Sequence, residues 1–194
     1  MSTPVLQIDT HHGIRTVTIN RPDKLNALNA ATLDALDAAF ANAAADDSVR
    51  VVVLTGAGPK AFVAGADIAE MNTLSPVQGR DFSLRGTRMM RRVEKLNKPV
   101  IAMINGFALG GGLELAMCCH LRIAADSAKL GQPEINLGLI PGFGGSQRLL
   151  RLCGRAATLE LCLTGAPINA ERALQLGIVN RVVPAAELEA ETTK

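Results

Sequence analysis

The chain has 194 residues, of which 48% are apolar and 20% are charged, and its formal net charge is +2. This length suits one folding unit with a sizeable core, and the near-neutral charge gives no basis for a nucleic-acid partner. Aromatic residues make up only 3%, with no Trp and no Tyr, which also argues against surfaces that stack bases.

The first quarter of the chain predicts strands and a helix in alternation. Two short strands, 5–8 and 17–19, flank a turn at 11–13. An asparagine can cap a helix over 30–45, where apolar residues recur at helical spacing, and 49–54 is a β-branched run typical of a buried strand. A strand, a helix and a strand in this order indicate a crossover unit.

Small residues predominate around Gly65, so the backbone there can closely approach another segment or a ligand, although a plain turn explains the pattern equally well. Ser75 and Pro76 then predict the start of a helix that ends near Leu96. Its basic residues favour a solvated face, with a basic rim for an anionic ligand as the alternative. These residues are Arg88, Arg91, Arg92 and Lys95.

The second half continues the alternation of strands and helices. Strands are expected at 100–104 and 121–124, and the tail after Pro184 has the composition of a starting helix. The remaining expected elements are helices over 146–152, 155–163 and 170–176, and a strand over 178–183.

Four cysteines and three histidines give no metal or disulfide pattern. The cysteines, without a C-x-x-C pair, are interpreted as buried reduced thiols, and His11 and His12 as exposed turn residues. His120 is interpreted as a structural polar group rather than a zinc ligand. The sequence shows no secretory leader and no apolar run of about 18 residues, so we expect a cytoplasmic protein without a membrane partner. The cysteines are Cys118, Cys119, Cys153 and Cys162.

The stretch 105–145 is the one most suggestive of chemistry. It contains a triple glycine at 110–112, the carboxylates of Glu114 and Glu134, and a second glycine-rich turn at 141–145. Burial of an unpaired carboxylate costs several kcal/mol, on the order of 1–5 pKa units. Two carboxylates in apolar surroundings therefore indicate a functional role for both groups. The signatures of dinucleotide, P-loop, nucleophile-elbow and zinc-protease sites are all missing.

Backbone donors and carboxylates can work together in such a stretch. A triple glycine that opens a helix exposes free N–H groups at its positive end, where a developing oxyanion can bind. The segment 65–66 can supply a second donor, and Glu114 and Glu134 can share a water as base and acid. The alternative is that Glu114 only caps its helix and Glu134 is a surface loop residue.

Five segments in the same order identify a resemblance to the enoyl-CoA hydratase (crotonase) family, over about residues 5–184. They are LNALN (25–29), FVAGADI (62–68), KPVIAMINGFALGGGLELAMCC (98–119), GQPEINLGLIPGFGGSQRL (131–149) and LTGAPINAERALQLGIVNRVVP (163–184).

The resemblance implies an α/β fold built as a spiral of ββα repeats. It implies a single crotonase-fold domain over 1–194, with the spiral core at about 5–184 and the truncated start of a C-terminal helical region at 185–194. In the family several more helices follow, which cover the CoA pocket and build a trimer that usually pairs into a hexamer. A homotrimer or hexamer is therefore expected where those helices are present.

The resemblance also assigns roles to residues. The backbone N–H groups of Ala66 and Gly111 would form the oxyanion hole, Glu114 would activate the water, and Glu134 would protonate C2. CoA is part of the substrate, and neither a cofactor nor a metal is implied. The implied substrate and CoA pocket comprises Ala64, Gly65, Ala66, Asp67, Ile68, Gly110, Gly111, Pro133 and Gly142.

The implied activity is that of a hydro-lyase: reversible addition of water to trans-2-enoyl-CoA, giving 3-hydroxyacyl-CoA, in degradation of fatty acids or related acyl-CoA compounds. The presence of both glutamates favours hydration over other reactions of the family. The alternatives are another such reaction, for example enoyl-CoA isomerisation, and a non-catalytic acyl-CoA-binding or assembly subunit. His120 departs from the pattern, because many hydratases carry an aspartate there.

Overall fold

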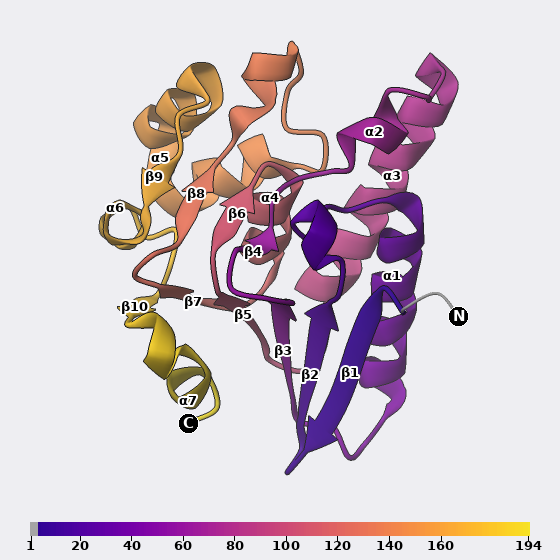
Figure 1. Ribbon diagram of the computed structural model, residues 1–194, viewed down its shortest axis with the longest axis vertical. Coiled ribbons are helices and arrows are strands. Elements are labelled where there is room, and N and C mark those ends of the chain that lie inside the picture. The colour runs from indigo at the N-terminus through magenta and orange to yellow at the C-terminus, as the bar shows by residue number, and fades with distance from the viewer. Residues whose placement is uncertain (1–3) are drawn as a thin grey trace.

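The structure, a computed structural model, describes residues 4–194, which fold into two sheets surrounded by helices (Figure 1). The strands are β1 (Leu6–His11), β2 (Ile14–Ile19), β3 (Val51–Gly56), β4 (Ala61–Val63), β5 (Val100–Ile104), β6 (Phe107–Leu109), β7 (Leu121–Ala125), β8 (Lys129–Gly131), β9 (Ile168–Asn169) and β10 (Arg181–Val183). The helices are α1 (Ala30–Ala45), α2 (Ile68–Met71), α3 (Pro76–Glu94), α4 (Gly111–Cys118), α5 (Gly145–Thr164), α6 (Ala170–Gln175) and α7 (Leu188–Thr192). Short 3₁₀ helices occur at Pro22–Lys24, Pro133–Leu137 and Ala185–Glu187.

From β3 to β8, consecutive strands alternate between the two sheets. The six-stranded sheet has the order β1-β2-β3-β5-β7-β10, and the four-stranded sheet has the order β4-β6-β8-β9. Each of the strand pairs β3/β4, β5/β6 and β7/β8 is followed by a helical segment. The first strand of each pair lies parallel to the first strand of the preceding pair in the large sheet, and the second strands are parallel neighbours in the small sheet. This arrangement is the spiral of ββα repeats that the resemblance implies.

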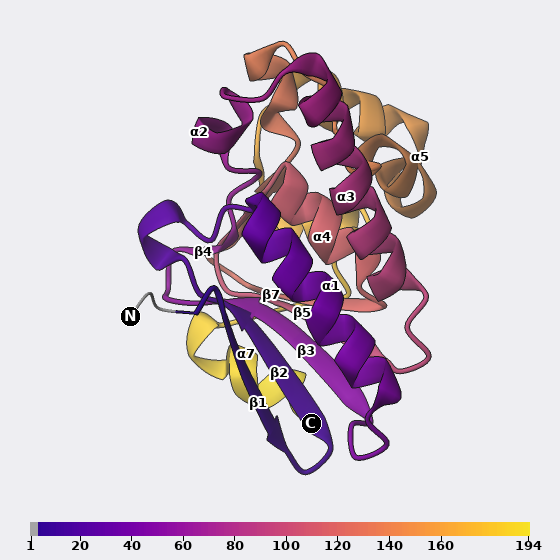
Figure 2. The same ribbon diagram turned by 90° about the vertical axis from the view of Figure 1, so that its right-hand side faces the viewer.

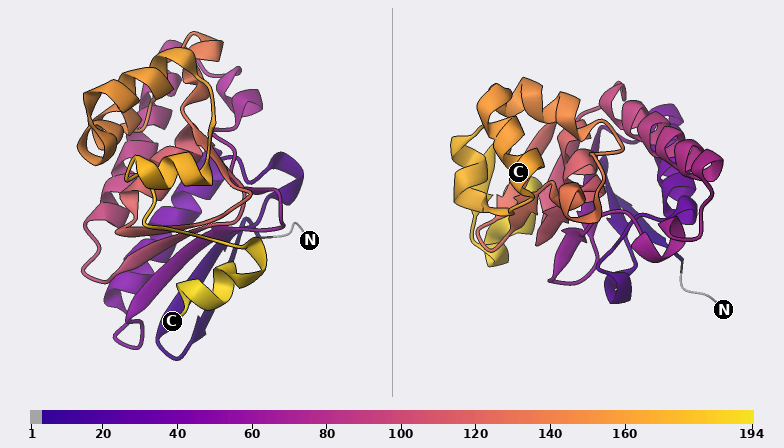
Figure 3. Two further views of the ribbon diagram at one scale, coloured as in Figure 1. Left: turned by 90° about the vertical axis from the view of Figure 1, so that its left-hand side faces the viewer. Right: turned by 90° about the horizontal axis from the view of Figure 1, so that it is seen from above.

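Helices cover both faces of the large sheet. Helix α1 lies across β1 to β3 with α3 beside it, and α7 lies behind the same sheet (Figure 2). The main apolar core fills the space on the α1 side, while a small cluster of Ile123, Ala125 and Leu188 fills the α7 side. Helices α5 and α6 lie on the side of the molecule away from α1 and α3 (Figure 3).

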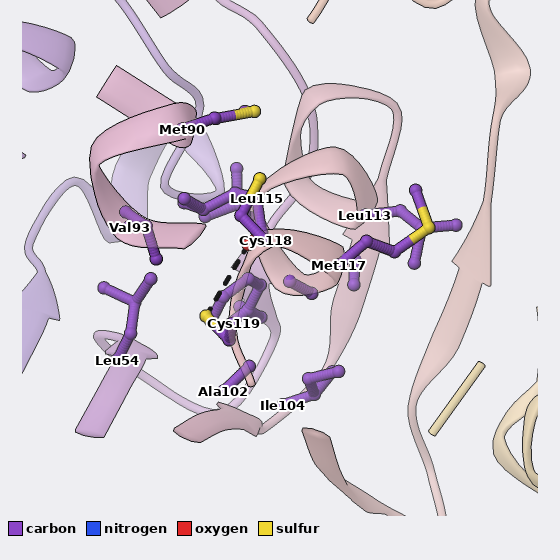
Figure 4. Packing of buried hydrophobic residues seen from close by; sticks show 14 of the residues in the cluster. Leu54, Met90, Val93, Ala102, Ile104, Leu113, Leu115, Met117, Cys118 and Cys119 are labelled. Carbon is purple, nitrogen blue, oxygen red and sulfur yellow. Dashed lines mark hydrogen bonds between the residues drawn. The ribbon is translucent and has the colours of Figure 1, made fainter. Parts of the chain in front are cut away.

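Helix α4 is the buried centre of the molecule, and every one of its residues is buried. Its apolar side chains pack against α3 and the large sheet, and the Cys119 sulfur lies 3.6 Å from the Leu115 carbonyl (Figure 4). Gly112 allows the helix to contact β4, because a Cβ there would lie 1.9 Å from the Val63 carbonyl oxygen. The triple glycine therefore permits burial of the helix start.

Local signals placed several element ends correctly. Asn29 caps α1 by accepting from the Thr32 N–H at 2.9 Å, and Ser75 forms a capping box at the start of α3. Helix α3 ends at Glu94, two residues before the expected Leu96. The two helices expected at 146–163 form the single element α5, kinked at Gly154, whose backbone is not helical.

Other expectations need correction. The first strand continues to His11, so the turn is confined to His12 and Gly13. The last strand begins at Arg181, because the apolar pair 178–179 is buried in the core as irregular chain. The four-stranded sheet was not predicted, since its strands have only two or three residues and are too short to show an alternating pattern.

The polar and sulfur-containing residues singled out by sequence have simple surroundings. The His120 ring nitrogen Nδ1 accepts from the Val100 N–H at 2.8 Å, which makes it a structural polar group. Cys118 and Cys119 are buried, whereas Cys153 and Cys162 are half-buried, and all four are free thiols. Arg88, Arg91 and Arg92 are exposed on α3, and Lys95 is exposed directly after its end. In residues 4–194 no helix is long and apolar enough to cross a membrane.

Candidate active site

A cavity of about 350 Å³ lies where α3, the start of α4 and the two glycine-rich loops meet. It brings together all the expected site residues except Asp67. The expected residues that line it are Ala64, Gly65, Ala66, Ile68, Gly110, Gly111, Glu114, Pro133, Glu134 and Gly142. Two segments that are far apart in sequence, 64–68 and 133–143, thereby become neighbours.

Glu114 is fixed by the second glycine-rich turn. Its side chain is 1% exposed, and Oε1 accepts from the Phe143 N–H at 2.9 Å and from the Gly145 N–H at 2.6 Å. A Cβ on Gly145 would lie 2.8 Å from Glu114 Cγ and 2.5 Å from the Gln132 amide, so only glycine fits. Gly144, with φ of 93°, reverses the chain between the two donors.

The ionisation of Glu114 is balanced near neutrality. Burial raises the pKa of Glu114 from about 4.5 to about 7, the Gly145 and Phe143 N–H groups oppose this rise, and the nearby Glu134 carboxylate adds to it. A carboxyl with this pKa can both take up and release a proton near pH 7. The interpretation of Glu114 as a mere helix cap is not supported, because its Oε1 accepts from the turn at 143–145 and not from its own helix.

Glu134 lies at the start of the 3₁₀ helix Pro133–Leu137, where it is half-buried. With its amide nitrogen turned toward the carboxylate, the buried Gln132 donates to Glu134 Oε1 and Oε2 at 2.9 and 3.0 Å. Burial raises the pKa of Glu134. A Cβ on Gly110 would lie 2.9 Å from Glu134 Oε1, which places this carboxylate beside the start of α4. Gln132 was not anticipated, although it stands only two residues before Glu134.

Two backbone N–H groups at the cavity are free. The segment around Ala66 is held to Leu28, whose N–H donates to the Gly65 carbonyl and whose carbonyl accepts from the Asp67 N–H. Within residues 4–194 neither the Ala66 N–H nor the Gly111 N–H has an acceptor. A Cβ on Gly111 would lie 3.5 Å from the Ala66 nitrogen, so the two donors flank one small region at the positive end of α4.

Asp67 does not line the cavity. Its carboxylate caps α2 and pairs with Arg21 at a distance of 2.8 Å, and both side chains are largely buried. The Arg21 guanidinium holds the pKa of Asp67 below its ordinary value. In this structure Asp67 therefore secures the loop that carries Ala66.

The rest of the cavity wall is mainly apolar and was not identified from the sequence. Phe82 and Phe143 pack with ring centroids 5.7 Å apart and form part of it. Only Ser83 adds a polar side chain beyond the two glutamates among the lining residues, and its hydroxyl donates to the Gly142 carbonyl at 2.6 Å. The further apolar lining residues are Met71, Leu137, Leu139 and Ile140.

Comparison with known proteins identifies relatives of this chain. A family model described as enoyl-CoA hydratase/isomerase matches residues 9–194. The short-chain-enoyl-CoA hydratase of Clostridium acetobutylicum is 52% identical over 175 residues, which cover 90% of this chain and 67% of that protein. The crotonyl-CoA hydratase of Syntrophomonas wolfei is 48% identical, with coverage of 96% of this chain and 72% of that protein.

A solved structure agrees with the sequence relatives. The crystal structure of enoyl-CoA hydratase from Bacillus anthracis superimposes with a TM-score of 0.95 at 42% identity. The match covers 97% of this chain and 74% of that one. The match of the family model, the identities and the shared fold together show that the chain belongs to the enoyl-CoA hydratase/isomerase family and has the crotonase fold.

Proposed function

We propose that the protein is an enoyl-CoA hydratase, which adds water reversibly to a trans-2-enoyl-CoA thioester to give a 3-hydroxyacyl-CoA. The observation that carries this proposal is the placement of two carboxyls with raised pKa, Glu114 and Glu134, beside two free N–H groups in one apolar cavity. The names of the relatives, which include short-chain-enoyl-CoA and crotonyl-CoA hydratases, support the same reaction.

The two free N–H groups would act on the thioester carbonyl. When its oxygen accepts from Ala66 and Gly111, electron density is drawn from the conjugated double bond and C3 becomes electrophilic. As water adds to C3, negative charge develops on the carbonyl oxygen as an enolate. A preorganised donor at such an oxygen contributes about 3–4 kcal/mol to stabilisation of the transition state.

The two carboxyls would move the protons. The Glu114 carboxylate takes a proton from water while the water oxygen forms its bond to C3, and protonated Glu134 delivers a proton to C2. Oε1 of Glu114 is held by two backbone donors, so Oε2 is the oxygen available to the water. The two groups interact, and the pH profile would therefore report pKa values of the pair.

The substrate carries CoA, and the proposed step requires no other cofactor. Segments 64–66 and 110–111, whose residues are small, would let the extended chain of the thioester pass close to the backbone. The acyl group would occupy the apolar part of the cavity. The substrate to test first is crotonyl-CoA, because relatives are named for short acyl chains.

The test is the loss of the conjugated enoyl-thioester absorbance when the 194-residue chain is mixed with crotonyl-CoA, followed by identification of the product. Formation of 3-hydroxybutyryl-CoA is expected. Conversion of a 3-enoyl-CoA to the 2-enoyl isomer without hydration would instead establish isomerisation. Binding of crotonyl-CoA without turnover would contradict the proposal and support an acyl-CoA-binding protein.

A further inference from the structure

Arg148 connects three elements just behind the site, although it does not line the cavity. Its side chain, on α5, is 12% exposed. Nε donates to Glu94 Oε1 at 2.6 Å, at the end of α3, and Nη1 donates to the Phe143 carbonyl. The guanidinium lies against Gly144, where a Cβ would be 2.9 Å from Nη1.

The peptide groups of Phe143 join this arginine to the carboxylate of Glu114. The carbonyl of Phe143 accepts from Arg148, and the N–H of Phe143 donates to Glu114 Oε1 at 2.9 Å. The next donor to the same oxygen, Gly145 N–H, begins α5 three residues before Arg148. Movement of this turn would therefore move both donors that orient the glutamate.

We propose that Arg148 is a positioning residue for Glu114, which fixes the 143–145 turn through the Phe143 carbonyl and supplies a positive charge behind the buried carboxylate. The inference rests on the proposed function, since hydration is one of its readouts. The competing explanation is a purely structural clamp between α3 and α5, made by the Arg148–Glu94 pair.

The charges around Glu114 make the two explanations separable. The titratable and charged groups that act on it or around it are Cys118 on its own helix, Glu94 on α3, Arg148 and Cys162 on α5, and Glu134. Arg148 is the cation among these five. Burial, the largest influence, and Glu134 raise the pKa of Glu114, whereas the charge of Arg148 lowers it. Loss of a mere clamp would lower stability without a change in this ionisation.

The experiment compares Arg148→Met with Arg148→Lys, which keeps the charge but not the planar fork that reaches two partners. For Arg148→Met we expect kcat to fall about 10- to 100-fold with a smaller change in KM, because the carboxylate loses its orientation. The acidic limb of the kcat profile should also move to higher pH. Arg148→Lys should leave that limb in place and lower kcat less.

The matched control is Arg92→Met, which removes an exposed ion pair between α3 and Asp37 outside the cavity. Its kcat and pH profile should equal those of the wild type. If Arg148→Met does not fold, as judged by circular dichroism, Arg148→Gln replaces it, since an amide can still donate to the Phe143 carbonyl without charge.

Direct titration of the Glu114 carboxyl separates failure of this inference from failure of the proposed function. The signal is the ¹³C-carboxyl resonance that Glu114→Gln removes, and it requires no turnover. A pKa that rises in Arg148→Met or Arg148→Gln supports the inference even if the wild type does not hydrate crotonyl-CoA. An unchanged Glu114 titration with an unchanged acidic limb would overturn the inference, and the structural clamp between α3 and α5 would then be the role of Arg148.

Discussion

At the scale of single residues, opposing influences act on the pKa of Glu114. Burial makes its charged form costly, while two backbone donors on one oxygen partly offset that cost. The second oxygen stays free of protein partners within the described chain. Glu134 differs, because a single buried amide, Gln132, serves both of its oxygens. The two carboxyls are therefore suited to different steps of proton transfer.

The proposed acid–base pair predicts that Glu114→Gln and Glu134→Gln each lower kcat for crotonyl-CoA by about 10²- to 10⁴-fold, because positioned proton transfer contributes on that scale. The fold should be retained, since glutamine is isosteric with glutamate. Steady-state hydration rates, with melting curves as the control, provide the check. A near-wild-type rate in either folded variant would refute the paired mechanism.

The raised pKa of Glu114 also predicts a dependence of stability on pH. The unfolded state releases this proton near pH 4.5 and the folded state near pH 7, so between these values the folded state binds more protons. The stability contributed by the protonated form is fully present below pH 4.5 and is lost as pH rises through 7. The loss amounts to about 3 kcal/mol.

Glu114→Gln removes this titration. The free energy of unfolding of the variant minus that of the wild type should therefore increase by about 3 kcal/mol between pH 4.5 and pH 8, because only the wild type loses stability over this range. Urea denaturation of both proteins at several pH values measures the difference. Parallel pH curves would show that Glu114 titrates normally in the folded protein.

At the scale of elements, the 141–145 turn does most to build the site. It presents two N–H groups to Glu114, contributes Phe143 to the cavity wall and begins α5. Two of its glycines are required, Gly144 by its backbone φ of 93° and Gly145 by the space that Glu114 and Gln132 occupy. The resemblance to the family had given this turn one site residue, Gly142.

Gly145→Ala tests the space argument. The new Cβ would lie 2.5 Å from the Gln132 amide and 2.8 Å from Glu114 Cγ, so both side chains must move. We expect a loss of about 1–3 kcal/mol in the free energy of unfolding and at least a ~10-fold lower kcat. The stability control is Gly79→Ala in α3, where nothing lies within 4 Å, and which should gain about 0.4–1 kcal/mol. A Gly145→Ala protein as stable and active as wild type would show that the site is not tightly packed.

At the scale of the whole molecule, the cavity depends on alternation of strands between two sheets. Each passage from the large sheet to the small one ends in a segment that reaches the site: 64–68 after β4, 110–111 after β6, and 132–134 after β8. Helix α7, on the far face of the large sheet, contributes no lining residue to the cavity. Substitutions in α7 should therefore lower the stability of the protein without lowering its activity.

Leu188→Ala tests this separation. Leu188 on α7 is 5% exposed and packs with Ile123 and Ala125 on the face opposite the main core. We expect a loss of about 2–4 kcal/mol in the free energy of unfolding, with kcat for crotonyl-CoA within about two-fold of wild type under conditions where the variant is folded. Leu159→Ala, at a 43% exposed position on α5, should change stability by less than about 0.5 kcal/mol. A large loss of kcat in folded Leu188→Ala would show that α7 is coupled to the site.

The sequence by itself determined the features that neighbouring residues encode. Asn29 and Ser75 predicted helix starts through side chains that bond within three residues, and the triple glycine predicted the free N–H groups at the start of α4. The order of the five family segments predicted the fold and the two glutamates. These signals are local or cumulative along the chain, so they do not require knowledge of which segments meet.

Only the tertiary structure decided what each site residue contacts. The residues that donate to Glu114 lie 29 and 31 positions further along the chain. The Asp67 carboxylate pairs with an arginine 46 positions away and does not line the cavity. Burial, and with it the raised pKa of Glu114, exists only once these segments pack together. Local sequence sets backbone preference, whereas the pairing of distant segments sets solvent exposure, charge and hydrogen-bond partners.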